Sequence, residues 1–285
     1  MHMLVITRVH NLMFFSKYYF NVLGGYRLKN RGVIFWTIVM MFFLTACKGK
    51  VTTEEGYQLV EEGKLIFAAS GEFKPFSYMD KDGKMVGFDI EVGEAVAKEL
   101  GLEPVQKKQK FASIVEGVKS GRFDIAVASH TITEDRLKEV NFSTPYYYSG
   151  AQIFTRINSS IETLEDLKGK EVAVSKGSTY ASILEGVTDN IVLLDSDVTA
   201  LEALSKGKHD AVVTDFITGK EGIASGMEIV GKQFIEPSEQ AIAVAKGNEK
   251  LLEKINEALE RLRKNGTLKK ISEKYFGEDI TVKPN

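Results

Sequence analysis

Cysteine is almost absent from this chain of 285 residues, which contains only Cys47. A single cysteine excludes an intramolecular disulfide and a zinc site built from thiolates. Histidine is scarce as well, because only His130 and His209 follow Cys47. The one tryptophan, Trp36, lies in an apolar stretch near the N-terminus. We expect neither a metal ion nor a cofactor.

An excess of positive charge is also missing. The chain holds 37 Lys+Arg against 39 Asp+Glu, for a formal net charge of −2. The first 46 residues contain basic residues and no acid, so the chain from Cys47 onward is more acidic than the total indicates. An acidic body lacks the positive surface that binds phosphate backbones, which argues against nucleic acid as the main partner. The length and the 44% of hydrophobic residues are typical of a globular protein of about two domains.

The sequence motifs of several common enzymes are absent. The chain has no G-x-x-x-x-G-K-[ST], no G-x-G-x-x-G, no H-E-x-x-H and no G-x-S-x-G. Ser129-His130 and His209-Asp210 place triad residue types side by side, but neighbours on a strand point to opposite faces of the sheet. We therefore expect a protein that is not an enzyme.

The N-terminal segment has the pattern of an export signal. Residues 32–46 form an uncharged apolar run after Lys29 and Arg31, too short for a membrane-spanning helix. The run ends in Leu-Thr-Ala-Cys at 44–47, which resembles a bacterial lipobox. The alternative is a core cysteine at the end of a buried helix. The lipobox resemblance implies a signal peptide over 1–46, then a lipidated Cys47 that begins a polar tether over 47–61.

Residues 12–20 are apolar too, which is unusual in the basic part of a signal. We state as a hypothesis that translation starts at Leu28, which leaves the mature protein unchanged. A reporter fusion with a stop codon before position 28 tests it, because expression is lost if translation starts at Met1.

The body of the chain alternates between strand and helix patterns. Strands are predicted at 64–69, 124–128, 171–175, 191–194 and 211–214. Helices are predicted at 89–100, capped by Asp89, and at 112–119, 179–184, 198–205, 249–263 and 267–275. This rhythm predicts an α/β fold with two sheets of parallel type. Residues 80–84 resemble a calcium loop, but Lys84 and Met85 are wrong for one, and we predict a hairpin turn there.

Polar residues follow several of these strands, where open α/β sheets bind ligands. Ser129 and Thr131 end one strand, and Arg136 begins the next helix, where its planar guanidinium suits a carboxylate. Ser175, Ser178 and Thr179 surround a glycine loop before a helix, whose free N–H groups suit an anion. A surface salt bridge for Arg136 and simple helix capping in the glycine loop are the alternatives.

An acid and two aromatic residues complete this set. Asp215 follows the strand at 211–214 and could receive an ammonium group, or else cap the next helix. Phe73 and Phe111 lie in loops and could form flat apolar walls, or else pack in the core. Taken together, a cation, an acid and apolar walls suit an α-amino acid, because a buried charge needs a partner of opposite sign.

The sequence resembles the bacterial extracellular solute-binding proteins of family 3 over about residues 62–280. The stretches that carry the resemblance are GEFKPF (71–76), GFDI (87–90), SGRFDI (120–125), TITEDR (131–136), NFSTPYY (141–147), DLKGK (166–170), NGT (265–267) and KYFG (274–277). The family's fold is a two-lobed, periplasmic-binding-protein-like fold of type II. The resemblance implies one lobe over 62–146 plus 240–285 and a second over 151–236. It implies hinge strands near 147–150 and 237–239.

The resemblance also implies roles and partners. Arg136 would hold the α-carboxylate with backbone N–H groups of Thr131 and Thr179, and Asp215 would hold the α-ammonium with Ser129 and the Thr131 hydroxyl. Phe73 and Phe111 would sandwich the side chain, and Ser175 and Ser178 would line the opposing lobe. The protein would be an extracytoplasmic receptor, anchored to the membrane through Cys47 and expected to be monomeric, that delivers an amino acid to an ABC permease and its ATPase.

The sequence restricts the identity of the bound amino acid less than it restricts the class of protein. Ser70 stands where relatives that bind basic side chains or glutamine often have aspartate, whereas Glu72 keeps a cationic ligand possible. The segments 273–282 and 146–152 look most like the cystine-binding branch, so a polar amino acid is favoured, with L-cystine or a related sulfur amino acid ahead. Two alternatives are a sensor without a permease and a dehydratase of the same fold, for which Glu72 is the candidate acid. His130 is expected to pack outside the pocket.

Overall fold

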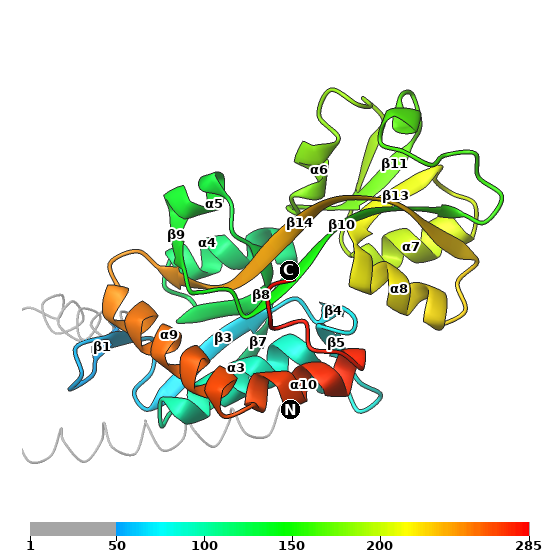
Figure 1. Cartoon of the computed structure of the whole chain (residues 1–285). Helices are drawn as coiled ribbons and strands as arrows, with labels where there is room; N and C mark the ends of the chain where they lie inside the picture. The colour runs from blue at the N-terminus through cyan, green and yellow to red at the C-terminus, as the bar shows by residue number, and fades with distance from the viewer. Residues whose placement is uncertain (1–49, 285) are drawn as a thin grey trace, which may run out of the picture. The chain divides into compact units, whose positions relative to one another are not determined.

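The computed structural model describes residues 50–284 (Figure 1). The helices are α3 (Phe88–Glu99), α4 (Ile114–Lys119), α5 (Glu134–Glu139), α6 (Tyr180–Ile183), α7 (Asp197–Ser205), α8 (Phe216–Ala224), α9 (Glu249–Lys264) and α10 (Thr267–Phe276), with 3-10 turns at Phe111–Ser113 and Glu165–Leu167. The first strands are β1 (Val51–Thr52), β2 (Gln58–Leu59), β3 (Lys64–Ala69), β4 (Glu72–Phe73), β5 (Ser77–Met79), β6 (Met85–Val86) and β7 (Glu103–Lys108). The others are β8 (Ile125–Thr131), β9 (Val140–Phe142), β10 (Tyr147–Arg156), β11 (Val172–Ser175), β12 (Ile191–Leu194), β13 (Ala211–Asp215) and β14 (Ile229–Ala245).

The main strands form one continuous sheet in the order β12-β11-β13-β10-β14-β8-β3-β7, with β9 also paired to β14. The expectation of two separate parallel sheets is therefore wrong in one respect. The strands β3, β7 and β8 are parallel, as are β11, β12 and β13. The long strands β10 and β14 are antiparallel to each other and to one strand on each side, and so they join the two parallel groups.

These two groups of elements are the lobes of the fold, and β10 and β14 run from one to the other (Figure 1). The first lobe holds β3 to β9, α3 to α5, the end of β14, α9 and α10. The second holds β11 to β13 and α6 to α8. Within the crossing pair, Tyr148 lies opposite Glu239 and Gly150 opposite Pro237, which is where the hinge was predicted. The lobe boundaries themselves stay a prediction.

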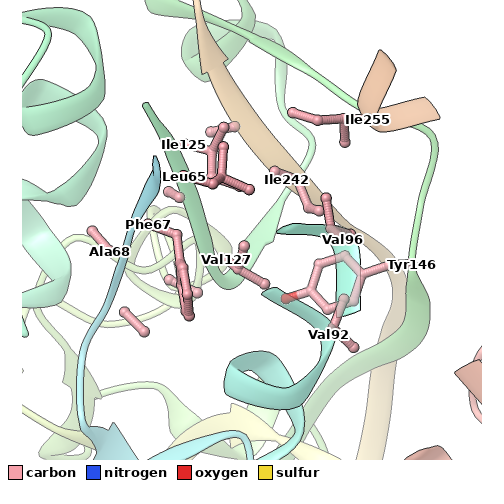
Figure 2. Close-up of a cluster of buried hydrophobic side chains, with 14 of the residues drawn as sticks. Leu65, Phe67, Ala68, Val92, Val96, Ile125, Val127, Tyr146, Ile242 and Ile255 are labelled. Atoms are coloured by element: carbon pink, nitrogen blue, oxygen red, sulfur yellow. The ribbon is translucent and has the colours of Figure 1, made fainter. Parts of the chain in front are cut away.

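Each lobe has its own buried core. In the first lobe, apolar side chains of β3, β8 and α3 pack together with Ile242 of β14 and Ile255 of α9 (Figure 2). Two further clusters lie in the second lobe, one around Ile153 and Val213 and one around Phe154 and Val212. Because neighbours along β10 and β13 point to opposite faces, these two clusters cover the two faces of that lobe's sheet.

The predicted strands and helices are found with small shifts, and the hairpin turn at 80–84 is confirmed. The Asp80 carboxylate accepts hydrogen bonds from the backbone N–H groups of Asp82 (2.9 Å) and Lys84 (2.8 Å), so it stabilises a turn between β5 and β6. No group of three or more metal-ligating side chains occurs in residues 50–284. The prediction that Asp89 caps α3 is wrong, because the cap is Gly87 and Asp89 is fully buried.

The tether predicted over 47–61 ends earlier than expected. Tyr57 and Leu59 are buried in the core of the first lobe. The backbone N–H of Val60 donates to the Asp124 carboxylate at 2.7 Å, and Gln58 exchanges hydrogen bonds with the Asn248 side chain. Residues 57–60 therefore belong to the folded first lobe, because the side chains of Tyr57 and Leu59 pack in its core.

The signal peptide, the lipidation of Cys47 and the Leu28 start all fall outside the described residues. Within the described part of the chain, no helix is long and apolar enough to cross a membrane.

Candidate functional site

A cavity of about 470 Å³ lies between the lobes. It contains all but one of the binding residues predicted from the sequence. Its lining consists of Ser70, Glu72, Phe73, Phe111, Ser129, Thr131 and Arg136 from the first lobe, and of Ser175, Ser178, Thr179, Tyr180, Asp195, Ser196 and Asp197 from the second.

Arg136 supplies the positive charge of this cavity. It lies in the first turn of α5, where the Thr133 side chain caps the helix by accepting from the Arg136 N–H. The guanidinium donates to the backbone carbonyls of Thr131 (2.8 Å) and Gly177 (3.0 Å). Among the described residues, no carboxylate forms an ion pair with it. Burial lowers the Arg136 pKa to about 10, and the partly buried cation is suited to an anionic ligand group.

Asp197 supplies a negative charge from the other lobe. It is the first residue of α7, after the capping residue Ser196, and it is 8% exposed. The Thr214 hydroxyl donates to its carboxylate at 2.7 Å. Burial raises the Asp197 pKa, and no Lys or Arg in the described part of the chain pairs with it. The cavity therefore holds a cation and an acid from different lobes, each without a partner of opposite charge.

Asp215 is the predicted site residue that does not line the cavity. Its carboxylate accepts from the backbone N–H groups of Ile217 (2.9 Å) and Thr218 (3.4 Å), so it caps α8. The sequence-based assignment of the ammonium-binding acid to Asp215 stays a prediction. Asp215 ends β13 and caps α8, whereas Asp197 is the first residue of α7, separated from the end of β12 by Asp195 and Ser196, and it lines the cavity.

The two predicted aromatic residues both line the cavity. Phe73 stacks on Phe76 with ring centroids 5.0 Å apart, and Phe111 stacks on His130 at 4.6 Å. The Arg136 guanidinium lies 5.8 Å from the Phe111 ring. His130 is 1% exposed and lies behind Phe111, outside the lining, as expected. Burial, and to a smaller extent the charge of Arg136, lowers the His130 pKa well below its usual value, so the ring is neutral.

The glycine loop of the second lobe approaches the first lobe closely. The Ser178 hydroxyl donates to the Ser175 carbonyl at 2.7 Å, which closes the turn between β11 and α6. Gly177 has φ +81°, and a Cβ there would lie 2.8 Å from the Cα of Ala112 in the first lobe. Only glycine allows this approach, which brings Ser178 and Thr179 to the cavity.

Several lining residues were missed or were not assigned a binding role. Asp195, Ser196 and Asp197 follow β12, and the rule that ligands bind at strand ends could have found them. Tyr180 follows Thr179 and carried no signal of its own. Ser70 was noted only as a departure from relatives, whereas Glu72 was noted as an acid that keeps a cationic ligand possible and as the candidate acid of a dehydratase. The Glu72 carboxylate is paired with Lys108 (3.0 Å), and Asp195 is paired with Lys110 across the two lobes.

Further polar contacts join the lobes beside the cavity. The Ser196 hydroxyl donates to the Glu72 carbonyl at 2.8 Å. Lys74 of the first lobe pairs with Glu221 of α8 at 2.8 Å. The lobes are therefore in contact around the site in this structure.

Two α/β lobes that share crossing strands, with a cavity between them that carries opposite charges, define a two-lobed binding protein for a small polar molecule. The chain belongs to the bacterial extracellular solute-binding proteins, family 3, which it matches over residues 65–278. Membership of an extracellular family implies a location outside the cytoplasm.

Similar proteins include both binding proteins and a precursor of an enzyme. The chain is 35% identical over 230 residues to the L-cystine-binding protein TcyJ of Escherichia coli (strain K12), covering 78% of this chain and 85% of that protein. An ancestral arginine-binding protein bound to arginine is 39% identical, with a TM-score of 0.72 and coverage of 76% and 99%. An ancestral amino acid-binding protein, a precursor of cyclohexadienyl dehydratase, is 32% identical, with a TM-score of 0.71 and coverage of 75% and 96%.

Proposed function

We propose that this protein is the receptor of an ABC uptake system, which captures a polar L-amino acid outside the cell and delivers it to a membrane permease. One observation carries the proposal. Of the charged side chains that line the cavity, Glu72 and Asp195 are each paired with a lysine. Arg136 and Asp197 have no ion pair among the described residues. The charges left for a ligand are thus one cation and one acid, the complement of an α-amino acid.

The energetics favour a ligand that carries both charges. A charge taken out of water is destabilising when it has no partner, and a zwitterion would neutralise the buried Asp197 and the partly buried Arg136 at once. In our assignment Arg136 holds the α-carboxylate with backbone N–H groups of Thr131 and Thr179. Asp197 holds the α-ammonium with Ser129 and the Thr131 hydroxyl.

The remaining lining residues would contact the ligand side chain or close the site. We assign Phe73 and Phe111 as the walls on either side of the stem, and Ser175 and Ser178 as polar groups of the second lobe. A ligand held by residues of both lobes favours the closed form, because it binds that form better than the open one.

We favour L-cystine or a related sulfur amino acid as the ligand. Glu72 is paired with Lys108 and Asp195 with Lys110, so apart from Asp197 no acid of the lining is left unpaired for a cationic side chain. These two ion pairs place positive and negative charge side by side at the cavity, which suits a ligand side chain that itself carries both charges. The similarity to an L-cystine-binding protein supports the same choice. L-Arginine is the second candidate, since a similar solved structure is an arginine-binding protein.

We propose no catalytic step. The candidate acid of a dehydratase, Glu72, is paired with Lys108 at 3.0 Å. We also propose that the receptor is monomeric and anchored by a lipid on Cys47, with the residues up to Lys50 as the tether. Mass spectrometry of the membrane fraction tests the anchor, since an unmodified Cys47 would contradict it.

Calorimetric titration of the mature chain tests the function, with the common amino acids, L-cystine and small dicarboxylates as ligands. We expect one polar amino acid to bind, and Arg136→Ala to abolish this binding while the unfolding temperature stays near that of the wild type. Arg261→Ala is the control, because Arg261 of α9 pairs with Glu99 of α3 and does not line the cavity.

Reductant gives a second control for this titration. It should remove binding of L-cystine by cleaving its disulfide, but it should leave L-arginine binding unchanged. Wild-type affinity in Arg136→Ala would overturn the proposal, and so would a wild-type chain that binds no amino acid.

A further inference from the structure

Ser129 has an unusual backbone conformation. Its φ is +56°, and it is the only non-glycine residue in the described part of the chain with a positive φ. A serine in this left-handed region is strained, and the surrounding structure must offset that strain. Ser129 also lines the cavity, so the strain lies at the binding site.

Two buried side chains hold Ser129 in this conformation. The Ser129 N–H donates to the Tyr146 hydroxyl at 3.0 Å, and the Ser129 hydroxyl donates to the Asp89 carboxylate at 2.8 Å. The Tyr146 hydroxyl in turn donates to the second Asp89 oxygen at 2.6 Å. The three residues thus form a closed ring of hydrogen bonds, which we call the Asp89 network.

The network places a charge where the fold alone does not need one. Asp89 and Tyr146 are both 0% exposed, and Asp89 has no ion pair with a described residue. The Tyr146 ring lies among apolar side chains of the first lobe, close to Val92 and Val96 (Figure 2). A buried carboxylate without a counter-ion is destabilising compared with an apolar or neutral group of the same size. The network must therefore do something besides packing.

The direction of the hydrogen bonds shows what it does. Burial raises the Asp89 pKa to about 7, so the carboxylate is ionised above that pH, where the binding tests below are made. Ionised carboxylate oxygens only accept hydrogen bonds, so the hydrogen of the Ser129 hydroxyl then points at Asp89. What the hydroxyl offers to a ligand is then its lone pairs. An oxygen with free lone pairs attracts an ammonium group, whereas a hydroxyl hydrogen in the same place would repel it.

We propose that Asp89 and Tyr146 are positioning residues for the ligand's ammonium group, which fix the Ser129 backbone and turn its hydroxyl into an obligatory acceptor. The inference rests on the proposed function, because it needs a ligand with an α-ammonium. Asp89 acts only through Ser129, since it does not line the cavity.

Asp89→Asn is the informative variant. It keeps the size of the side chain and removes the charge, and its amide can donate to Ser129, which frees the hydroxyl hydrogen to turn into the cavity. We expect the affinity for L-cystine to fall by roughly tenfold or more, as for a lost hydrogen bond to a charged group. The unfolding temperature should stay equal or rise, because a buried charge is removed. A purely structural role would instead lower stability and affinity together.

A desamino ligand separates the ammonium contact from the rest of the site. The probes are L-cystine and 3,3′-dithiodipropionate, which lacks both ammonium groups. If the wild type binds L-arginine instead, the pair is L-arginine and 5-guanidinopentanoate. We expect Asp89→Asn to weaken the amino acid and to leave the Kd of the desamino acid within about twofold, the scatter expected of independent sites.

Tyr146→Phe is the second variant, which tests the same inference if Asp89→Asn does not fold. It removes the bridging hydroxyl and should also weaken the amino acid more than its desamino analogue. Tyr275→Phe is the matched control, because the Tyr275 hydroxyl donates to the Glu91 carboxylate at 2.6 Å away from Ser129. If both network variants bind the amino acid as the wild type does, or lose both probes equally, the inference is overturned. A wild type that binds no amino acid overturns the proposed function as well.

Discussion

Asp197 and Asp215 both lie at the start of a helix, Asp197 as the first residue of α7 and Asp215 as the cap of α8, and they differ in what they contact. The Asp215 carboxylate accepts hydrogen bonds from the N-terminus of α8, whereas Asp197 lines the cavity. We predict that Asp197→Asn weakens amino acid binding by roughly tenfold or more, because it removes the charge opposite the ammonium. Asp215→Asn should bind like the wild type, since asparagine is also a good helix cap. Calorimetry on both variants decides, and the reverse result would restore the assignment to Asp215.

The same Asp215 variant makes a prediction about stability and pH. Burial raises the Asp215 pKa to about 7, above the ordinary value of 3.8. Between these pH values the folded chain keeps a proton that the unfolded chain has lost, so this group lowers stability as the pH rises. Asp215→Asn should therefore gain on the wild type by up to about 1.4 kcal/mol per pH unit from pH 4 to 7, with no further gain above. Urea unfolding at several pH values measures this, and a constant difference would contradict the raised pKa.

At the scale of elements, the start of α3 depends on one glycine. Gly87 caps the helix with φ +130°, and a Cβ there would lie 2.2 Å from the Phe76 carbonyl oxygen. Gly83 in the hairpin also has a positive φ, +74°, but open space around it. We predict that Gly83→Ala costs only about 1–2 kcal/mol, the price of the left-handed conformation. Gly87→Ala should cost clearly more, because the backbone must also shift. Denaturant unfolding compares the two, and equal losses would contradict the close contact.

The helices and turns were the elements best predicted from the sequence. The end of α9 is an example, because Asn265 and Gly266 mark it in the sequence and Gly266 has φ +78° in the structure. The crossing strands β10 and β14 were missed over most of their length. The middle of β14 is partly exposed and polar, since it bridges the lobes and faces water on both sides there. A strand of that kind lacks the alternation of buried and exposed residues that identifies strands.

For the whole molecule, closure should depend on contacts outside the cavity. Lys74 and Glu221 pair across the lobes at 2.8 Å, and neither lines the cavity. A partly exposed pair contributes about 0–1 kcal/mol, so we predict that Lys74→Ala weakens ligand binding by no more than about fivefold. The effect should shrink at high salt.

The exchanged pair, Lys74→Glu with Glu221→Lys, should bind the amino acid more tightly than either single charge reversal. Lys81→Ala, in the exposed hairpin turn, is the control and should bind as the wild type does. If Lys74→Ala lost binding altogether, Lys74 would have to contact the ligand, which the structure does not support.

The sequence by itself determined the alternating strands and helices, and it identified most residues of the cavity. The sequence identifies six of them from their position just after a strand, because the ends of parallel strands meet at one edge of a sheet. They are Ser129, Thr131, Arg136, Ser175, Ser178 and Thr179. That rule is local, since it needs only the end of a strand and the residues after it.

The tertiary structure alone decided which side chains line the cavity. Asp197 and Asp215 both lie where a helix follows a strand, yet Asp197 lines the cavity and Asp215 caps α8. Asp89 was taken for a cap, although it binds Ser129 from a segment 40 residues away. The direction of a side chain and its distant partners depend on how the elements pack, and the pattern of neighbours along the chain does not encode them.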